Sequence, residues 1–138
     1  MLVGPTGIGK SLLVSAVISH ISKQHGRDPP PANTISLFHT TIGTFASCWE
    51  GYSVMVLDGI FEAAIQHAPS VITFDFLSYW GLRAPDNDRD AQWTAAFIDH
   101  TAAASKKGVL VIGTFCTSSN TRESVDMSLV NKLDIACT

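Results

Sequence analysis

A glycine-rich segment near the start of the chain limits the fold more than any other feature. Residues 4–11, Gly-Pro-Thr-Gly-Ile-Gly-Lys-Ser, match the pattern G-x-x-x-x-G-K-[ST] at each fixed position, and an apolar, helix-prone run follows at once. Glycines in this pattern let backbone N–H groups turn toward phosphate oxygens, while the next helix directs its positive end at the same place. The segment therefore predicts a phosphate-binding loop between a strand and a helix.

The last two side chains of this loop have separate expected roles. Lys10 is placed to reach the β- and γ-phosphates of a bound nucleotide, and Ser11 is placed to offer its hydroxyl to Mg²⁺, the usual companion of a triphosphate. The predicted nucleotide-binding residues are Gly4, Pro5, Thr6, Gly7, Ile8, Gly9, Lys10 and Ser11.

An acidic residue at the end of an apolar segment is the second candidate for the metal site. Residues 71–76 form a nearly continuous apolar run, which predicts a strand buried on both faces of a parallel sheet. Asp75 near its end is expected to hold Mg²⁺ through the metal's water shell, together with Ser11. The alternative is an ordinary strand-terminal Asp that caps a turn.

Composition limits the remaining classes. The 138 residues, 46% of them hydrophobic, have the length and apolar content of one domain, and no apolar stretch approaches a membrane span. A net charge of −3 predicts no nucleic-acid partner. Three cysteines without C-x-x-C spacing, and the lack of a secretory signal, indicate an intracellular and cytoplasmic location. The five scattered histidines are expected to be structural or exposed, not metal ligands.

Strands and helices alternate along the chain, which predicts an α/β fold of the P-loop NTPase type, a doubly wound parallel sheet with helices on both faces. The first helix is expected to have its apolar stripe at Leu13, Val14, Val17, Ile18 and Ile21, and Asp90 is expected to cap the last one. The expected helices are Lys10 to about His25, closed by Gly26, residues 54 to 68 before Pro69, and Asp90 to Lys107 before Gly108; the expected strands are 35–38, 71–76 and 109–113.

The order of these motifs resembles the AAA family of ring-forming ATPases, from Gly4 to about Val130. Residues 68–75 are similar to the family's A-P-C-I-I-F-I-D segment. Residues 109–114 and 125–129 are similar to V-I-A-A-T-N and L-D-P-A-L. Residues 48–53 look like its aromatic pore loop K-Y-V-G-E-S, which places Trp49 where members grip a threaded polypeptide; core packing is the equal alternative for this Trp.

The resemblance implies ATP and Mg²⁺ as cofactors and a homo- or hetero-hexameric ring with other AAA subunits. A polypeptide substrate would be remodelled by that ring. Residues 1–138 would be the large nucleotide-binding subdomain. Because only Met1 to Val3 precede the loop and the chain ends early, we expect a truncated first strand and no helical lid.

Three departures from the family pattern concern hydrolysis. Phe76 stands where members carry the Glu that polarises the attacking water, and a missing general base costs about 10²- to 10⁴-fold in rate. Phe115 or Cys116 stands in place of a water-orienting Asn. Residues 130–135 contain no Arg for a neighbouring protomer's pocket, and Arg122 is not assigned that role. We therefore assign no catalytic residue.

These losses predict a degenerate AAA module, similar to the inactive ring of two-ring members such as the peroxisomal export ATPases. It would bind ATP with Mg²⁺, hydrolyse it weakly or not at all, and act in ring assembly. Three alternatives stay open. One is an active ATPase whose base is Asp86, Asp88 or Asp90; another is a vestigial interaction fragment. The third is a GTP-binding switch that uses Asn131-Lys132-Leu133-Asp134, an N-K-x-D match without an accompanying D-x-x-G.

Overall fold

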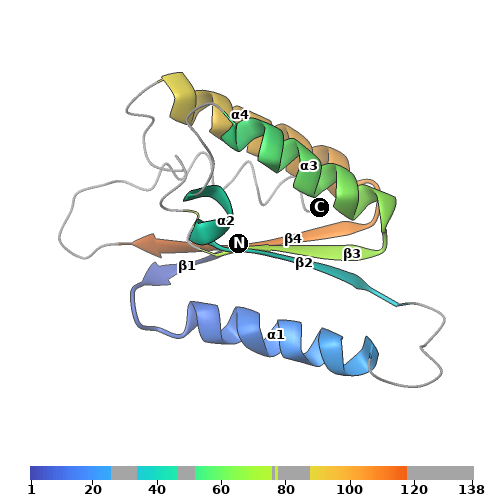
Figure 1. Cartoon of the computed structure of the whole chain (residues 1–138). Coiled ribbons are helices and arrows are strands. Elements are labelled where there is room, and N and C mark those ends of the chain that lie inside the picture. Colours follow the sequence, from blue (N-terminus) through green and yellow to red (C-terminus); the bar gives the residue numbers. More distant parts are fainter. Residues whose placement is uncertain (26–33, 47–51, 76, 78–87, 118–138) are drawn as a thin grey trace.

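Four parallel strands form the centre of the fold in the computed structural model (Figure 1). The structure describes residues 1–25, 34–46, 52–75, 77 and 88–117. In chain order the elements are β1 (Leu2–Pro5), α1 (Lys10–His25), β2 (Ser36–Thr40), α2 (Ile42–Ala46), α3 (Ser53–Gln66), β3 (Ser70–Phe74), α4 (Asp88–Ser105) and β4 (Val109–Thr117).

The strand order is β1-β4-β3-β2, so β4 separates the first strand from the third. The first half of β4 pairs with β3, with Val111 beside Ile72, and its second half pairs with β1, with Thr114 beside Leu2. Because all pairs are parallel, the carboxyl ends of the strands face one edge of the sheet, where ligands of open α/β sheets bind. The predicted α/β class with a parallel sheet is confirmed.

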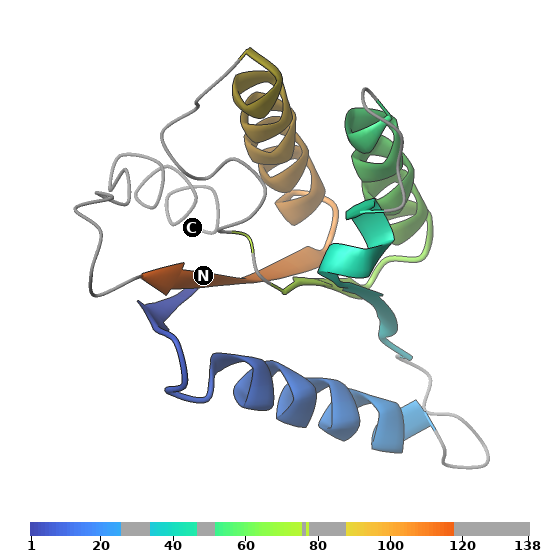
Figure 2. The same cartoon turned by 60° about the vertical axis from the view of Figure 1, so that its left-hand side comes forward.

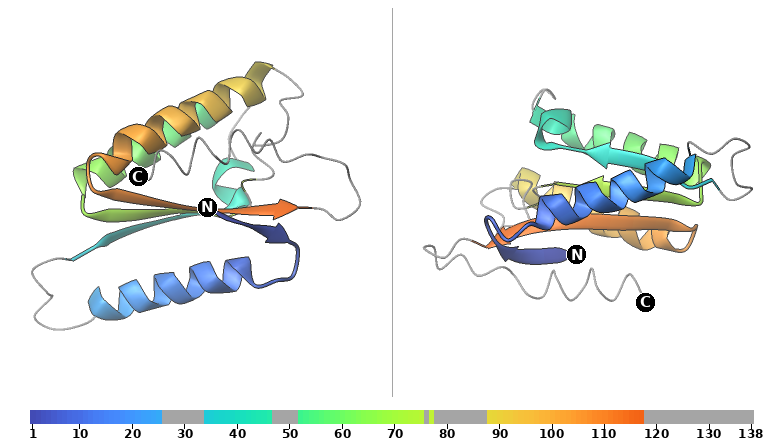
Figure 3. Two further views of the ribbon diagram at one scale, coloured as in Figure 1. Left: turned by 180° about the vertical axis from the view of Figure 1, so that it is seen from behind. Right: turned by 90° about the horizontal axis from the view of Figure 1, so that it is seen from below.

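The helices cover both faces of the sheet (Figures 1 and 2). α1 lies on one face, while α3 and α4 lie side by side on the other (Figure 3). On α1, Val14 is 3% exposed, whereas Leu13 is 52% exposed. The predicted apolar stripe is therefore wrong at Leu13, because the face that meets the sheet follows Val14, Val17, Ile18 and Ile21, and Leu13 lies on its flank.

Aromatic side chains fill the space between the sheet and the helices α3 and α4. The ring of Phe74, at the end of β3, lies 5.8 Å from that of Phe61 and 5.0 Å from that of Phe97, measured between centroids. Trp93 stacks on Phe97 at 5.2 Å, and Phe45 of α2 lies 6.2 Å from Trp93. All five rings are buried, so this cluster supplies much of the apolar area that stabilises the fold.

Two predicted strands have shifted ends for identifiable reasons. β3 ends at Phe74, and every residue from Ser70 to Phe74 is buried, which agrees with a central strand covered on both sides. β4 continues past Gly113 to Thr117, because β1 pairs with this second half. The second predicted strand, 35–38, is Ser36–Thr40 in the structure.

The helix predictions were correct in existence and mixed in detail. α1 spans Lys10–His25 as predicted, and the helix predicted from residue 54 is Ser53–Gln66, which ends before Pro69. α4 begins at Asp88, so Asp90 lies within its first turn and the prediction that Asp90 caps the helix is wrong. Gly108 after α4 has φ of +80°, the left-handed conformation expected after a helix.

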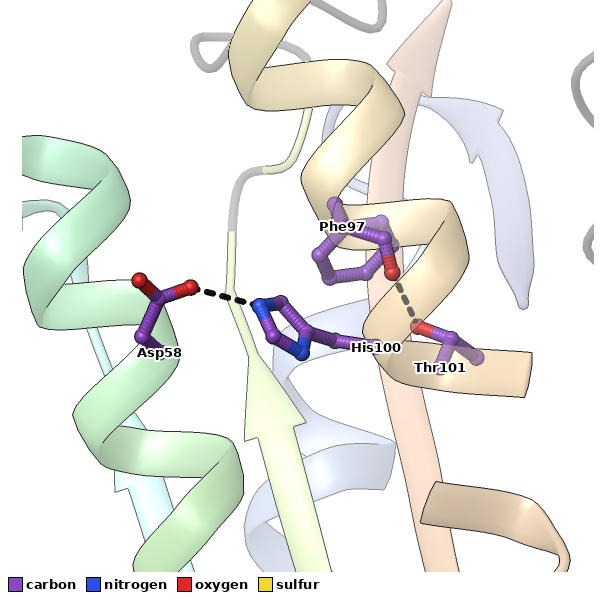
Figure 4. A network of polar contacts seen from close by, with 4 residues as sticks. All are labelled: Asp58, Phe97, His100 and Thr101. Atoms are coloured by element: carbon purple, nitrogen blue, oxygen red, sulfur yellow. Dashed lines mark hydrogen bonds and ion pairs between the residues drawn. The ribbon is translucent and has the colours of Figure 1, made fainter. Parts of the chain in front are cut away.

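A polar contact also joins the two helices that cover this face (Figure 4). The Nε2 atom of His100 on α4 lies 2.6 Å from Oδ1 of Asp58 on α3, and the His100 ring stacks on Phe61 at 5.2 Å. Beside it, the hydroxyl of Thr101 donates to the carbonyl of Phe97, 2.7 Å away. In the part of the chain that the structure describes, no helix is both long and apolar enough to cross a bilayer.

Replacing Phe61 tests the aromatic cluster. Phe61 is 1% exposed and contacts three rings, so Phe61→Ala is expected to lower the free energy of unfolding by about 3–5 kcal/mol in urea titrations. Met55 on the same helix is 63% exposed, and Met55→Ala should change stability by no more than about 0.5 kcal/mol. Equal effects of the two substitutions would contradict the described packing.

Candidate active site

Three segments far apart in the sequence meet at the carboxyl edge of the sheet. The predicted phosphate loop follows β1, Asp75 follows β3, and Thr114 lies in β4, which separates those two strands. The loop leads from β1 directly into α1 (Figure 1). The parallel topology alone therefore brings the loop and the carboxylate together.

The loop has the backbone shape that its glycines permit. Gly7 and Gly9 have φ of 89° and 92°, a region that residues with a Cβ rarely adopt. The Leu13 N–H donates to the Gly9 carbonyl at 2.9 Å, so the first helical turn begins inside the loop. Gly4 and Pro5 belong to β1, and the turn begins at Thr6. The positive end of α1 thus begins at the loop.

Lys10 folds back over the loop that precedes it. Its Nζ donates to the carbonyl of Gly4 at 2.8 Å and to that of Pro5 at 2.7 Å. An ammonium group has three N–H donors, so a phosphate oxygen can accept the third while both bonds persist. The two carbonyls therefore hold the positive charge at the mouth of the loop.

The Asp75 carboxylate connects the loop to the centre of the sheet. Its Oδ1 accepts a hydrogen bond from the Ser11 hydroxyl at 3.1 Å and another from the Thr114 hydroxyl at 2.6 Å. Ser11 is exposed on α1, whereas Thr114 is 1% exposed inside the sheet. The two residues predicted for the metal site therefore lie within hydrogen-bonding distance, although 64 positions separate them.

The backbone around Asp75 is held by the neighbouring strand. The Asp75 N–H donates to the Thr40 carbonyl at 3.2 Å, and the Thr40 hydroxyl donates to the Thr73 carbonyl at 2.7 Å. Both threonine side chains are buried. Two positions beyond Asp75, Leu77 is 1% exposed and packs on Gly113 of β4, where any Cβ would collide with it. These contacts fix where the chain leaves β3.

The donor set at this edge fits Mg²⁺ bound with a nucleotide. Mg²⁺ prefers oxygen ligands and takes only one or two from the protein beside phosphates and water, which matches one carboxylate and one hydroxyl. Among the described residues no group of three His, Cys, Asp or Glu side chains could hold a metal ion without further ligands. Ser11 and Asp75 would therefore need the phosphates to complete the site.

Thr114 is a site residue that the sequence motifs do not single out. It lies in the strand that resembles V-I-A-A-T-N, a motif whose functional Asn comes at its end. Phe115 is 4% exposed and belongs to the aromatic core on the α3 and α4 side. Since side chains alternate along a strand, Thr114 and Cys116 share the opposite face. Without a gap in the comparison with that motif, Cys116 stands close to the Asn position, on the face of Thr114.

Several predicted functional positions lie outside the described residues. They include Trp49, the candidate for gripping a polypeptide, and Phe76, which replaces the family's Glu. The other positions are Asp86, Arg122 and Asn131-Lys132-Leu133-Asp134. The backbones of Asp88 and Asp90 form the first turn of α4.

Comparison with known proteins agrees with this geometry. The family model described as "ATPase family associated with various cellular activities (AAA)" matches residues 1–137. Human vacuolar protein sorting-associated protein 4A is 35% identical over 75 residues, 54% of this chain and 15% of that protein. The A-like 2 form of the katanin p60 ATPase from Xenopus laevis is 36% identical over 77 residues, 56% of this chain and 13% of that protein. The chain thus aligns with only a small part of each relative's length.

Replacing Lys10 tests the phosphate loop. Lys10→Ala removes the ammonium that the Gly4 and Pro5 carbonyls hold, and should weaken nucleotide binding by about 2–5 kcal/mol, at least about 30-fold in Kd by calorimetry. The control is Lys23→Ala, which removes an exposed lysine from the other end of α1 and should leave Kd unchanged. Retained affinity in Lys10→Ala would refute the assignment of the loop.

Proposed function

Because this chain belongs to the AAA family of ATPases, we propose that it is the ATP-binding module of such an ATPase, with weak or no hydrolysis of its own. The observation that supports the proposal best is the hydrogen bond between Ser11 and Asp75, beside a loop whose Lys10 is already held at its mouth. These residues are the ones that phosphate and Mg²⁺ binding require.

Each part of the site has a distinct task in this proposal. Backbone N–H groups of the loop and the start of α1 bind the phosphates, and Lys10 neutralises part of their charge. Ser11 and Asp75 hold Mg²⁺, which when bound offsets charge on the β- and γ-phosphates. The buried sheet keeps these groups in place, so binding costs little reorganisation.

Hydrolysis needs a base, and the proposed module does not have one at the expected position. The phenyl ring of Phe76 cannot accept a proton, and the loss of the base alone costs about 10²- to 10⁴-fold. Cys116 or Phe115 in place of an Asn, and the lack of Arg in residues 130–135, remove two further aids to phosphoryl transfer. Phosphate and Mg²⁺ binding depend on none of these positions.

The role we propose for ATP is structural, within a homo- or hetero-hexameric ring of AAA subunits that remodels a polypeptide. A ligand that binds only the folded state at 100 times its Kd stabilises that state by about 2.7 kcal/mol, so no turnover is needed. Trp49 would contact the polypeptide. The likeness to vacuolar protein sorting-associated protein 4A and to a katanin ATPase supports an assembly of this type.

The decisive experiment measures binding and turnover together in the whole protein. We expect ATP with Mg²⁺ to bind, and phosphate release over hours to be negligible. Clear release that Lys10→Ala abolishes would show that another carboxylate, such as Asp88 or Asp90, replaces the missing base. A preference for GTP would instead favour the switch protein that uses Asn131 to Asp134. No nucleotide binding at all would leave an interaction module with a vestigial loop.

Restoring the base tests the explanation for weak hydrolysis. Phe76→Glu is expected to raise phosphate release only in a ring whose neighbouring protomer supplies an arginine, because that arginine is worth about 10³-fold or more in related enzymes. Phe76→Gln has a similar size without a base and should give no gain. A large gain in isolated monomers would contradict the proposed dependence on a neighbour.

A further inference from the structure

The tightest contact of the candidate metal site comes from a residue that is not a metal ligand. Thr114 donates to Asp75 Oδ1 at 2.6 Å, and the Ser11 hydroxyl reaches the same oxygen at 3.1 Å. Hydrogen bonds to ionised acceptors are short and about twice as strong as neutral ones. Of the two donors, Thr114 therefore restrains the carboxylate more strongly.

The two donors also differ in how firmly the fold holds them. Ser11 is exposed at the beginning of a helix, next to the glycine-rich loop. Thr114 is 1% exposed and lies in β4, whose neighbours on either side are β1 and β3. Its backbone is in register with Leu2 of β1, the strand that leads into the phosphate loop. Thr114 thus belongs to the most rigid part of the sheet.

We propose that Thr114 is the positioning residue of the metal site: it holds the Asp75 carboxylate in the orientation that Mg²⁺ with a nucleotide requires. When Ser11 turns its oxygen to the metal, its bond to Asp75 is lost, and the bond from Thr114 remains. Without Thr114 the carboxylate would have to be ordered by the metal itself, at a cost in conformational entropy. This inference rests on the proposed function and identifies a residue beyond the family's metal-binding pair.

The effect should appear in the part of the affinity that depends on Mg²⁺. The experiment measures Kd for ATP by calorimetry with Mg²⁺ and again with EDTA, and takes the ratio of the two. Loss of a group that orients a metal ligand typically costs about 10- to 100-fold in metal affinity. For Thr114→Val we expect the ratio to fall by about 10-fold or more, or to one where the wild-type ratio is smaller. The Kd in EDTA should stay unchanged.

Two variants separate positioning from general stability. Thr114→Ser keeps the hydroxyl and should restore the ratio. Thr101→Val removes another buried hydroxyl, which donates to the Phe97 carbonyl on α4, and should leave the ratio unchanged even if it lowers the unfolding midpoint. If Thr114→Val does not fold, Thr114→Ala is the substitute, since it removes the hydroxyl without adding a methyl group at that place.

A double-mutant cycle tests whether Thr114 acts through Asp75. In an Asp75→Asn background, Thr114→Val should cause no further loss of the ratio, because the carboxylate that it orients is absent. Additive losses, or an unchanged ratio in Thr114→Val, would overturn the inference. An unchanged ATP affinity in Lys10→Ala would instead refute the proposed function, so the two failures can be told apart.

Discussion

The parallel pairing of four strands is the constraint on which the site depends. β4 pairs with β3 through one half and with β1 through the other, so a single strand sets the distance between the phosphate loop and Asp75. The hydrogen bonds from Ser11 and Thr114 to Asp75 close this arrangement across the edge of the sheet. Because the main chain holds these positions, the charged groups converge without large rearrangement on binding.

The aromatic core supports the same arrangement from the opposite face. Phe74 is the last residue of β3 and contacts Phe45, Phe61 and Phe97, and the residue that follows it is Asp75. The packing that stabilises the fold therefore ends directly beside the candidate metal site. On the other face α1 contributes a single fully buried apolar side chain, Val14, so its orientation depends more on the loop and on β1.

The chain separates two requirements that active members of its family combine. Binding of phosphate and Mg²⁺ depends on Lys10, Ser11 and Asp75, which are present and brought together. Transfer of the phosphoryl group depends on a base at position 76 and on arginines, and the sequence has Phe76 and no arginine in residues 130–135. Loss of the second set with retention of the first is the pattern expected of a module that uses ATP to maintain an assembly.

The local sequence by itself determined the phosphate loop, the fold class, the helix α1 and the pairing of Ser11 with Asp75 as candidates, because these depend on glycine geometry, hydrophobic periodicity and a fixed motif. Only the tertiary structure decided the role of Thr114, the exposure of Leu13 and the length of β4. Each of these depends on which strand or helix lies beside the residue. A threonine that donates to a carboxylate 39 positions away leaves no periodic signal along the chain, since the contact exists only once β3 and β4 are paired.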